Sequence, residues 1–192
     1  LAEEDRSVNG NGLQVFGTVT KTAVATGADL VGYSGFSSGN YLNQPYNSDL
    51  DFGTGDFCFT MWLKSTAQGV HYAFQLNDAG VTSSKTIHFL PYYNGGILFN
   101  VGNTFTASQG NGLETGVWTH YAALRINGQV QVYKNGVLVN YFTAIGSLSN
   151  SDNRLTIGNR NSASANGAWR GSIALFRASA TAPSPEQIAK IY

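Results

Sequence analysis

Two Asn-Gly pairs, eight residues apart, constrain the fold of this chain more than any other feature. They are Asn127-Gly128 and Asn135-Gly136, and each lies between short runs of residues that favour strands. A two-residue type I′ turn needs positive φ at both central positions, and asparagine and glycine tolerate that conformation best. The spacing therefore predicts a meander of three consecutive antiparallel strands. These strands are expected at residues 118–126, 129–134 and 137–142.

Side-chain alternation predicts further strands along most of the chain. Residues 57–64 place Phe57, Phe59, Met61 and Leu63 on one face, and the other face is also rather apolar, which is typical of a central strand. Residues 105–116 are expected to form a polar loop. Other strands are expected at 13–21, 69–76, 86–93, 96–101, 155–158 and 169–178.

A short helix is predicted at the end of the sequence. Ser184 and Gln187 form a Ser-x-x-Gln capping box, and Pro185 suits the first helical position. With so many short strands and one short helix, the predicted fold class is all-β. We expect an antiparallel β-sandwich of the jelly-roll type with a short C-terminal helix.

Composition limits the classes of partner. Lysine and arginine balance aspartate and glutamate at 11 each, so the net charge is zero and a nucleic-acid-binding surface is not indicated. Cys58 is the single cysteine, which excludes an internal disulfide. No apolar run reaches membrane-spanning length, so membrane insertion is not expected. Residues 1–29 are interpreted as a connector and first strand, and residues 30–192 as the sandwich domain.

Three motifs together resemble the laminin-G-like members of the concanavalin A-like lectin/glucanase sandwiches. They are DFGTGDFCFTMWLK at 51–64, the run at 117–139 with its Tyr-x-Asn-Gly turn, and LTIGN at 155–159 followed by the strand that begins at Gly171. The resemblance implies an antiparallel sandwich whose surface loops bind a ligand.

A narrower resemblance concerns residues 32–57, which are similar to laminin-G-like domains of bacteriophage tail fibres and other virion proteins. It implies a virion or extracellular location and a host-surface glycan or receptor as the partner. Contacts with other virion subunits, including further copies of the chain, are also expected. A decoration domain that binds virion proteins, a bacterial adhesin module and a glycoside hydrolase remain as alternatives.

The acidic residues favour a protein that is not an enzyme. Glucanases of this superfamily carry Glu-x-Asp-x-x-Glu on one strand, because glycoside hydrolysis needs two facing carboxyl groups, and this motif is absent from the sequence. No catalytic residue is therefore assigned. Asp49, Asp51 and Asp56 form a tight group that suits either a turn or a calcium site.

The family resemblance also bears on calcium. Many members place an aspartate ligand in the strand after the conserved glycine, where this chain has Ala174. Calcium as a cofactor is therefore doubtful. The remaining candidate metal ligands are Asp78 and Asp152, which lie in segments that equally suit simple turns.

Sugar recognition usually combines an aromatic face with converging amides and hydroxyls. Three segments of the chain, at 71–78, 92–94 and 159–170, supply these residue types. The candidate ligand-binding residues are Tyr72, Gln75, Asn77, Asp78, Tyr92, Tyr93, Asn159, Arg160 and Asn161. Trp62, Trp118 and Trp169 are interpreted as packing residues instead.

Overall fold

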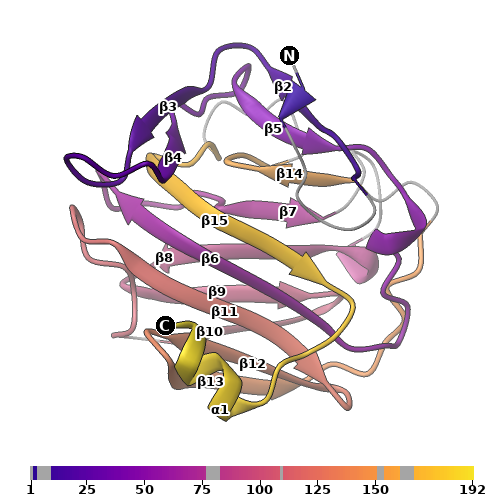
Figure 1. Ribbon diagram of the computed structural model, residues 1–192. Helices are drawn as coiled ribbons and strands as arrows, with labels where there is room; N and C mark the ends of the chain where they lie inside the picture. The colour runs from indigo at the N-terminus through magenta and orange to yellow at the C-terminus, as the bar shows by residue number, and fades with distance from the viewer. Residues whose placement is uncertain (1, 4–9, 77–82, 109, 151–153, 161–166) are drawn as a thin grey trace.

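A computed structural model describes residues 2–3, 10–76, 83–108, 110–150, 154–160 and 167–192. In these residues the chain forms short strands, two 3-10 turns and one α-helix (Figure 1). The first strands are β1 (Ala2–Glu3), β2 (Leu13–Phe16), β3 (Thr20–Ala23), β4 (Val31–Ser34), β5 (Tyr41–Gln44), β6 (Phe57–Ser65) and β7 (Phe74–Leu76). The later elements are β8 (Ile87–Tyr93), β9 (Gly96–Val101), β10 (Thr104–Ser108), β11 (Thr119–Ile126), β12 (Gln129–Lys134), β13 (Val137–Thr143), β14 (Leu155–Ile157), β15 (Gly171–Ser179) and α1 (Pro185–Ile191). The 3-10 turns are η1 (Ser48–Leu50) and η2 (Ser83–Lys85).

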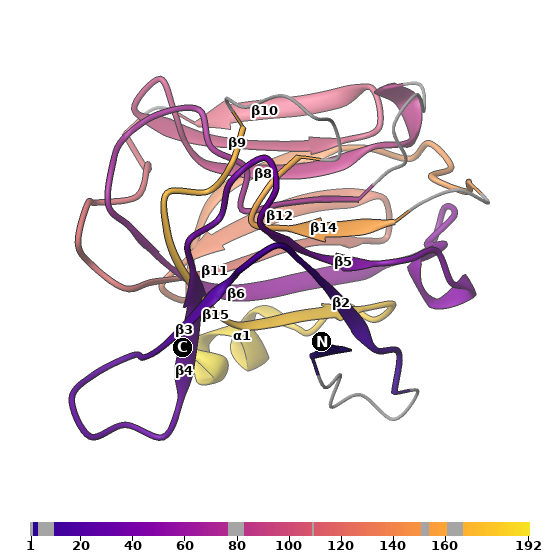
Figure 2. The same cartoon turned by 90° about the horizontal axis from the view of Figure 1, so that it is seen from above.

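The described strands form two antiparallel sheets packed face to face (Figures 1 and 2). Sheet A has the order β1-β2-β5-β14-β7-β8-β9-β10, and sheet B has the order β13-β12-β11-β6-β15-β4-β3. In Figure 1 sheet B lies in front of sheet A. The predicted antiparallel sandwich with a short C-terminal helix is thus confirmed. Among the described residues, the structure has no helix with the length and hydrophobicity needed to cross a bilayer.

The predicted meander is confirmed, with β11, β12 and β13 as consecutive neighbours in sheet B. Asn127 and Asn135 have φ of 50° and 51°, and each is followed by a glycine at positive φ. These are the values that a type I′ turn requires. Local turn chemistry therefore fixes this part of the topology.

The core lies between the sheets and is rich in phenylalanine. From sheet B, β6 directs Phe57, Phe59 and Met61 inward, and all three are buried. Phe59 meets Phe74 of sheet A with ring centroids 4.5 Å apart. The central position of β6, between β11 and β15, agrees with the apolar character of both its faces.

Some predicted boundaries were wrong. The strand expected at 13–21 is two strands, since β2 pairs with β5 in sheet A and β3 pairs with β4 in sheet B. Residues 104–108, placed mostly in a polar loop, form β10 at the edge of sheet A. An edge strand needs few apolar residues, so its composition resembles that of a loop.

A buried arginine joins loops at one end of the sandwich. The guanidinium of Arg125 donates hydrogen bonds to the carbonyl oxygens of Gly53 at 2.8 Å, Gly55 at 2.6 Å and Gly146 at 3.0 Å. It also lies over the ring of Phe57, 5.1 Å from its centroid. One side chain from β11 thus ties the segment before β6 to the segment after β13.

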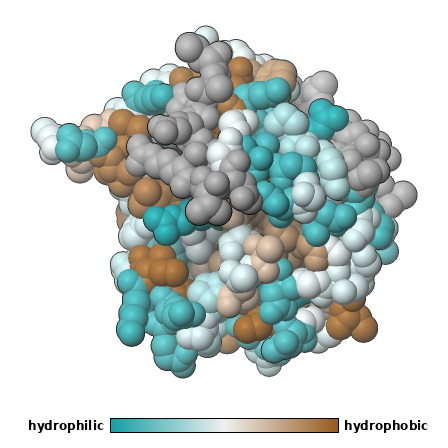
Figure 3. All heavy atoms as spheres, turned by 45° about the vertical axis from the view of Figure 1, so that its right-hand side comes forward, coloured by the Kyte–Doolittle hydropathy of each residue, from teal (hydrophilic) through white to brown (hydrophobic). Residues whose placement is uncertain are grey.

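The predicted capping box starts α1: the Ser184 hydroxyl accepts from the backbone N–H of Gln187, and the Gln187 side chain accepts from that of Ser184. The helix covers part of the outer face of sheet B through Ile188, which is fully buried in a cluster that includes Cys58 and Tyr133. The surface shown in Figure 3 has separate hydrophobic areas among hydrophilic ones.

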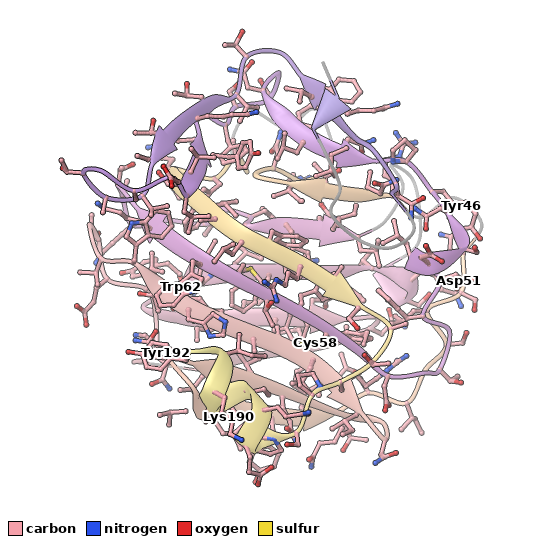
Figure 4. All side chains as sticks on the ribbon, in the orientation of Figure 1. Tyr46, Asp51, Cys58, Trp62, Lys190 and Tyr192 are labelled. Carbon is pink, nitrogen blue, oxygen red and sulfur yellow. The ribbon has the colours of Figure 1, made fainter. Side chains whose placement is uncertain are left out.

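Just after the helix, Tyr192 stacks on Trp62 of β6 with ring centroids 5.9 Å apart (Figure 4). Of the tryptophans interpreted as packing residues, Trp169 is buried in the core, whereas Trp62 and Trp118 are half-buried. Trp118 donates its indole N–H to the carbonyl oxygen of Val24 at 3.3 Å, which links β11 to the loop after β3.

Candidate functional site

The outer face of sheet A carries a row of polar side chains that runs across its strands. On these strands, core residues such as Phe74 and Phe89 alternate with the residues of the row. The residues of the row therefore face outward. Strand register places one outward residue of each strand beside the next. We call this set the outer row: Asn43, Thr156, Gln75, His88, Asn100 and Phe105.

Three of the predicted candidate residues, one from the outer row and two that flank it, lie around His88. The ring of Tyr72 meets the His88 ring edge-on, with centroids 5.3 Å apart. The guanidinium carbon of Arg160 lies over the ring of Tyr72, 5.8 Å from the ring centroid. Gln75 is directly opposite His88 in the β7–β8 pairing. The predicted candidates Tyr72, Gln75 and Arg160 therefore converge on one place.

A glycine allows this convergence. The backbone N–H of Tyr72 donates to the carbonyl oxygen of Gly167 at 2.9 Å. A β-carbon at Gly167 would lie 2.7 Å from Cδ of Arg160 and 3.3 Å from the ring of Tyr72. Any larger residue at this position would displace the arginine from the tyrosine.

The imidazole of His88 is neutral at physiological pH. Burial, and after it the positive charge of Arg160, lower its pKa from the usual 6.5 to about 4. A neutral imidazole presents one N–H donor and one nitrogen acceptor. It thus suits a hydroxyl-bearing ligand, which can both donate and accept.

Two buried polar atoms of the outer row have no hydrogen-bond partner within the described part of the chain. They are Nδ1 of His88 and the hydroxyl oxygen of Thr156. Gln75 lies between them, because β7 pairs with β14 on one side and with β8 on the other. Buried polar groups usually have partners, so these two atoms make this part of the row unusually polar.

Tyr92 lies further along β8, within the irregularity between Leu90 and Tyr93. Its hydroxyl donates to Oε1 of Gln68 at 3.1 Å, and its ring lies against Gly112. Tyr93 pairs with Gly96 in the β8–β9 hairpin. The structure therefore places Tyr92 at the end of the strand rather than in the cluster above His88.

Asn159 is buried and both ends of its amide contact the chain. Its Nδ2 donates to the carbonyl oxygen of Ser37 at 3.0 Å, and its Oδ1 accepts from the backbone N–H of Arg160 at 2.8 Å. Its contacts position Arg160 and hold the loop after β4. The other predicted candidates, Asn77, Asp78, Asn161 and Asp152, lie outside the described residues.

The described residues contain no group of three or more histidine, cysteine, aspartate or glutamate side chains that would hold a metal ion. Asp49 accepts from Nδ2 of Asn11 at 3.0 Å, and Asp56 accepts from the backbone N–H of Asn127 at 2.8 Å. Ala174, at the position where the family resemblance implies a calcium ligand, is buried opposite Trp62.

The three histidines do not converge. His88 lies on the outer face of sheet A, whereas His120 lies opposite Trp62 in sheet B. His71 precedes β7, and its pKa is lowered by burial and then by Arg170. Sequence reasoning missed five members of the outer row, namely Asn43, Thr156, His88, Asn100 and Phe105. Alternation within β8 would have placed His88 outward, but nothing local indicates which strands are neighbours.

Comparisons with known proteins agree with this architecture. The sequence pattern of the family described as the concanavalin A-like lectin/glucanases superfamily matches residues 34–189. No curated protein matches the sequence of the chain.

Among solved structures, one similar fold is domain 4 of the extracellular GH43 arabinanase AbnA from Geobacillus stearothermophilus, solved in complex with arabinotriose. It has a TM-score of 0.73 at 16% identity, over 94% of this chain and 87% of that one. The binding domain of Paraclostridial Mosquitocidal Protein 1 has a TM-score of 0.73 at 14% identity, over 98% of this chain and 48% of that one.

The receptor-binding domain of a botulinum neurotoxin C/D mosaic serotype has a TM-score of 0.68 at 15% identity, over 98% of this chain and 47% of that one. The chain thus spans about half the length of these toxin domains. At these identities the similarity establishes the fold.

Proposed function

We propose that this chain, which belongs to the concanavalin A-like lectin/glucanase superfamily, is a non-catalytic module that binds carbohydrate through the outer row of sheet A. The observation that carries the proposal is a pair of polar atoms on that row, on Thr156 and His88, that have no hydrogen-bond partner among the described residues, with Gln75 between them. A sugar presents neighbouring hydroxyls that both donate and accept, and these would satisfy such atoms.

Aromatic side chains next to these polar atoms support a sugar rather than a charged ligand. Tyr72 covers His88, and Phe105 is an exposed ring at the β10 end of the row. Aromatic faces pack against the C–H edges of a sugar ring, while amides and imidazoles fix its hydroxyls. The described members of the row include no carboxylate, and this supports binding without hydrolysis.

The structural relatives are consistent with this proposal. Their descriptions name arabinotriose for the arabinanase domain, and SialylT and ganglioside molecules for botulinum neurotoxin binding domains. We further propose that the partner is a glycan or receptor on a host surface and that the module belongs to a bacteriophage tail fibre or related virion protein. The similarity of residues 32–57 to such domains supports this setting.

A glycan array probed with the purified chain tests the proposal, followed by calorimetric titration with the best ligand. Gln75→Ala is expected to weaken binding about tenfold, because it removes hydrogen bonds worth roughly 1–1.5 kcal/mol. The matched control is Gln129→Ala, an exposed glutamine at the start of β12 in the other sheet. It should leave the affinity unchanged.

Equal affinities of wild type and Gln75→Ala would show that the ligand does not bind at the outer row. A blank array would overturn the carbohydrate proposal and favour the second candidate, a decoration domain with protein neighbours. That candidate is supported by the exposed apolar side chains of Val137, Leu138 and Tyr141 on β13. Pull-down against the other proteins of the virion would then identify the neighbour.

A further inference from the structure

The outer row continues beyond Asn43 onto the next strand of sheet A. Gln14 of β2 lies opposite Asn43 of β5, so the register adds one exposed amide to the row. Two residues along the same strands, Phe16 lies opposite Tyr41. Leu42 is in the core, so alternation directs its neighbours Tyr41 and Asn43 to the outer face. Residues directly opposite each other share a face, and Phe16 therefore lies there too.

Phe16 and Tyr41, which we call the β2–β5 pair, present aromatic surface to solvent. Their rings stack almost in parallel, with centroids 4.7 Å apart and an interplanar angle of 10°. Phe16 is 40% exposed and Tyr41 is half-buried. Neither residue belongs to the core clusters of the described part of the chain. A flat aromatic patch on a polar face suits the C–H edges of a sugar ring.

Aromatic rings therefore lie toward both ends of the outer row. The other ring is Phe105 of β10, which is 62% exposed. In sheet A the order from one to the other is β5-β14-β7-β8-β9-β10, and Figure 1 places β5 near the top of the sheet and β10 near its base. Five strand spacings of about 4.8 Å give a path of about 24 Å. A single sugar ring is far shorter than this path, whereas a chain of several sugars can follow it.

We propose that the β2–β5 pair is a further subsite for the same glycan, and that the outer face of sheet A takes the interior of an extended, linear polysaccharide instead of one terminal sugar. This inference rests on the proposed carbohydrate function. Between the aromatic rings, the exposed Gln14 and the half-buried Gln75 and His88 supply amide and imidazole groups for hydroxyls. A linear polysaccharide repeats its hydroxyls and C–H edges from unit to unit, so it matches a row of this composition.

An array of linear oligosaccharides of several compositions, graded in length from disaccharides to octasaccharides, tests the inference. Binding by the wild type is expected to strengthen with length and to level off once the chain reaches both aromatic ends. Phe16→Ala should weaken binding of the longest bound chains about five- to tenfold and leave the shortest ones nearly unchanged, because only long chains reach β2. Phe16→Tyr keeps the aromatic ring and should bind like the wild type.

The matched control is Tyr192→Ala, which also removes an exposed ring stacked on a second ring, here Trp62, but on the outer face of sheet B (Figure 4). It should bind like the wild type at every length. Circular dichroism and thermal unfolding check that each variant folds. Full affinity for a disaccharide, or equal binding of long chains by wild type and Phe16→Ala, would overturn the extended-chain inference and leave carbohydrate binding in place. A blank array would instead overturn the carbohydrate proposal, and this inference with it.

Discussion

The ring of Tyr72 packs edge-on against the imidazole of His88, with centroids 5.3 Å apart and an interplanar angle of 61°. This contact joins a residue just before β7 to the second residue of β8. Together with Arg160, it keeps the imidazole out of water and uncharged. We expect this contact to determine how the stability of the protein changes in acid. We also propose that a ligand binds the sheet beside it.

Acid is expected to destabilise the fold through His88. The unfolded chain binds a proton at this imidazole near pH 6.5, whereas the folded chain does so near pH 4. Between these values the unfolded state holds more protons, so the free energy of unfolding falls as the pH falls. We expect His88 to account for roughly 2 kcal/mol of the loss between about pH 7 and pH 4.5. Denaturant titrations at the two pH values measure it.

His88→Gln is the comparison for this prediction, since glutamine is polar and does not titrate. The variant should lose clearly less stability on acidification than the wild type. A residual loss is expected because burial also lowers the pKa of His71 and His120. An identical pH dependence in the two proteins would show that His88 does not resist protonation in the folded state.

Phe105 is expected to extend the binding surface beyond Asn100. It is exposed on β10, and its neighbour in the β9 register is Asn100. Phe105→Ala should weaken binding of a glycan that crosses the row by about five- to tenfold, while the unfolding midpoint stays within about 2 °C. Leu30→Ala serves as the control, because it truncates a comparably exposed apolar residue elsewhere. Unchanged affinity for ligands of every length would exclude Phe105 from the site.

Arg125 is expected to be essential for stability. Arg125→Met removes the charged donor from the carbonyl oxygens of Gly53, Gly55 and Gly146. Such losses cost about 3–5 kcal/mol in total. Urea unfolding measures the change, and Arg177→Met on β15, where the residue is exposed, provides a control. A loss below about 1 kcal/mol would show that water replaces the arginine without penalty.

Removing the anchor of α1 should expose the single cysteine. Cys58 is buried in the cluster around Ile188, and burial raises the pKa of its thiol to about 12, so it is expected to react slowly. Ile188→Ala should cost about 2–4 kcal/mol and speed the reaction with a thiol reagent at least tenfold. Ile191→Ala is the control because Ile191 is exposed. Equal reaction rates in the three proteins would show that the helix does not shield Cys58.

Local chemistry was sufficient to predict much of the fold. The Asn-Gly pairs determined the β11–β13 meander because few other residues accept positive φ at both turn positions. The apolar character of both faces identified β6 as a central strand, and Ser184 with Gln187 marked the start of α1. Each of these features depends on residues close together in the sequence.

The candidate site was predicted only in part. Tyr72, Gln75 and Arg160 were chosen for their residue types, and the structure places them around His88. That histidine was not assigned to the site, since a lone histidine in a strand gives no sign of its neighbours. Asn159 was chosen for the same reason as Arg160, yet both ends of its amide are hydrogen-bonded to the chain.

The sequence by itself determined which segments extend, where the chain turns and which residues face the core, because these follow from dihedral preferences and alternation over a few residues. Only the tertiary structure decided that Thr156 is in one row with Gln75 and His88, because β14 is far along the chain from β7 and β8. It likewise decided that β13, rather than another strand of the meander, ends the sheet. Strand order and register depend on how two whole sheets bury their common core, and no short segment contains that information.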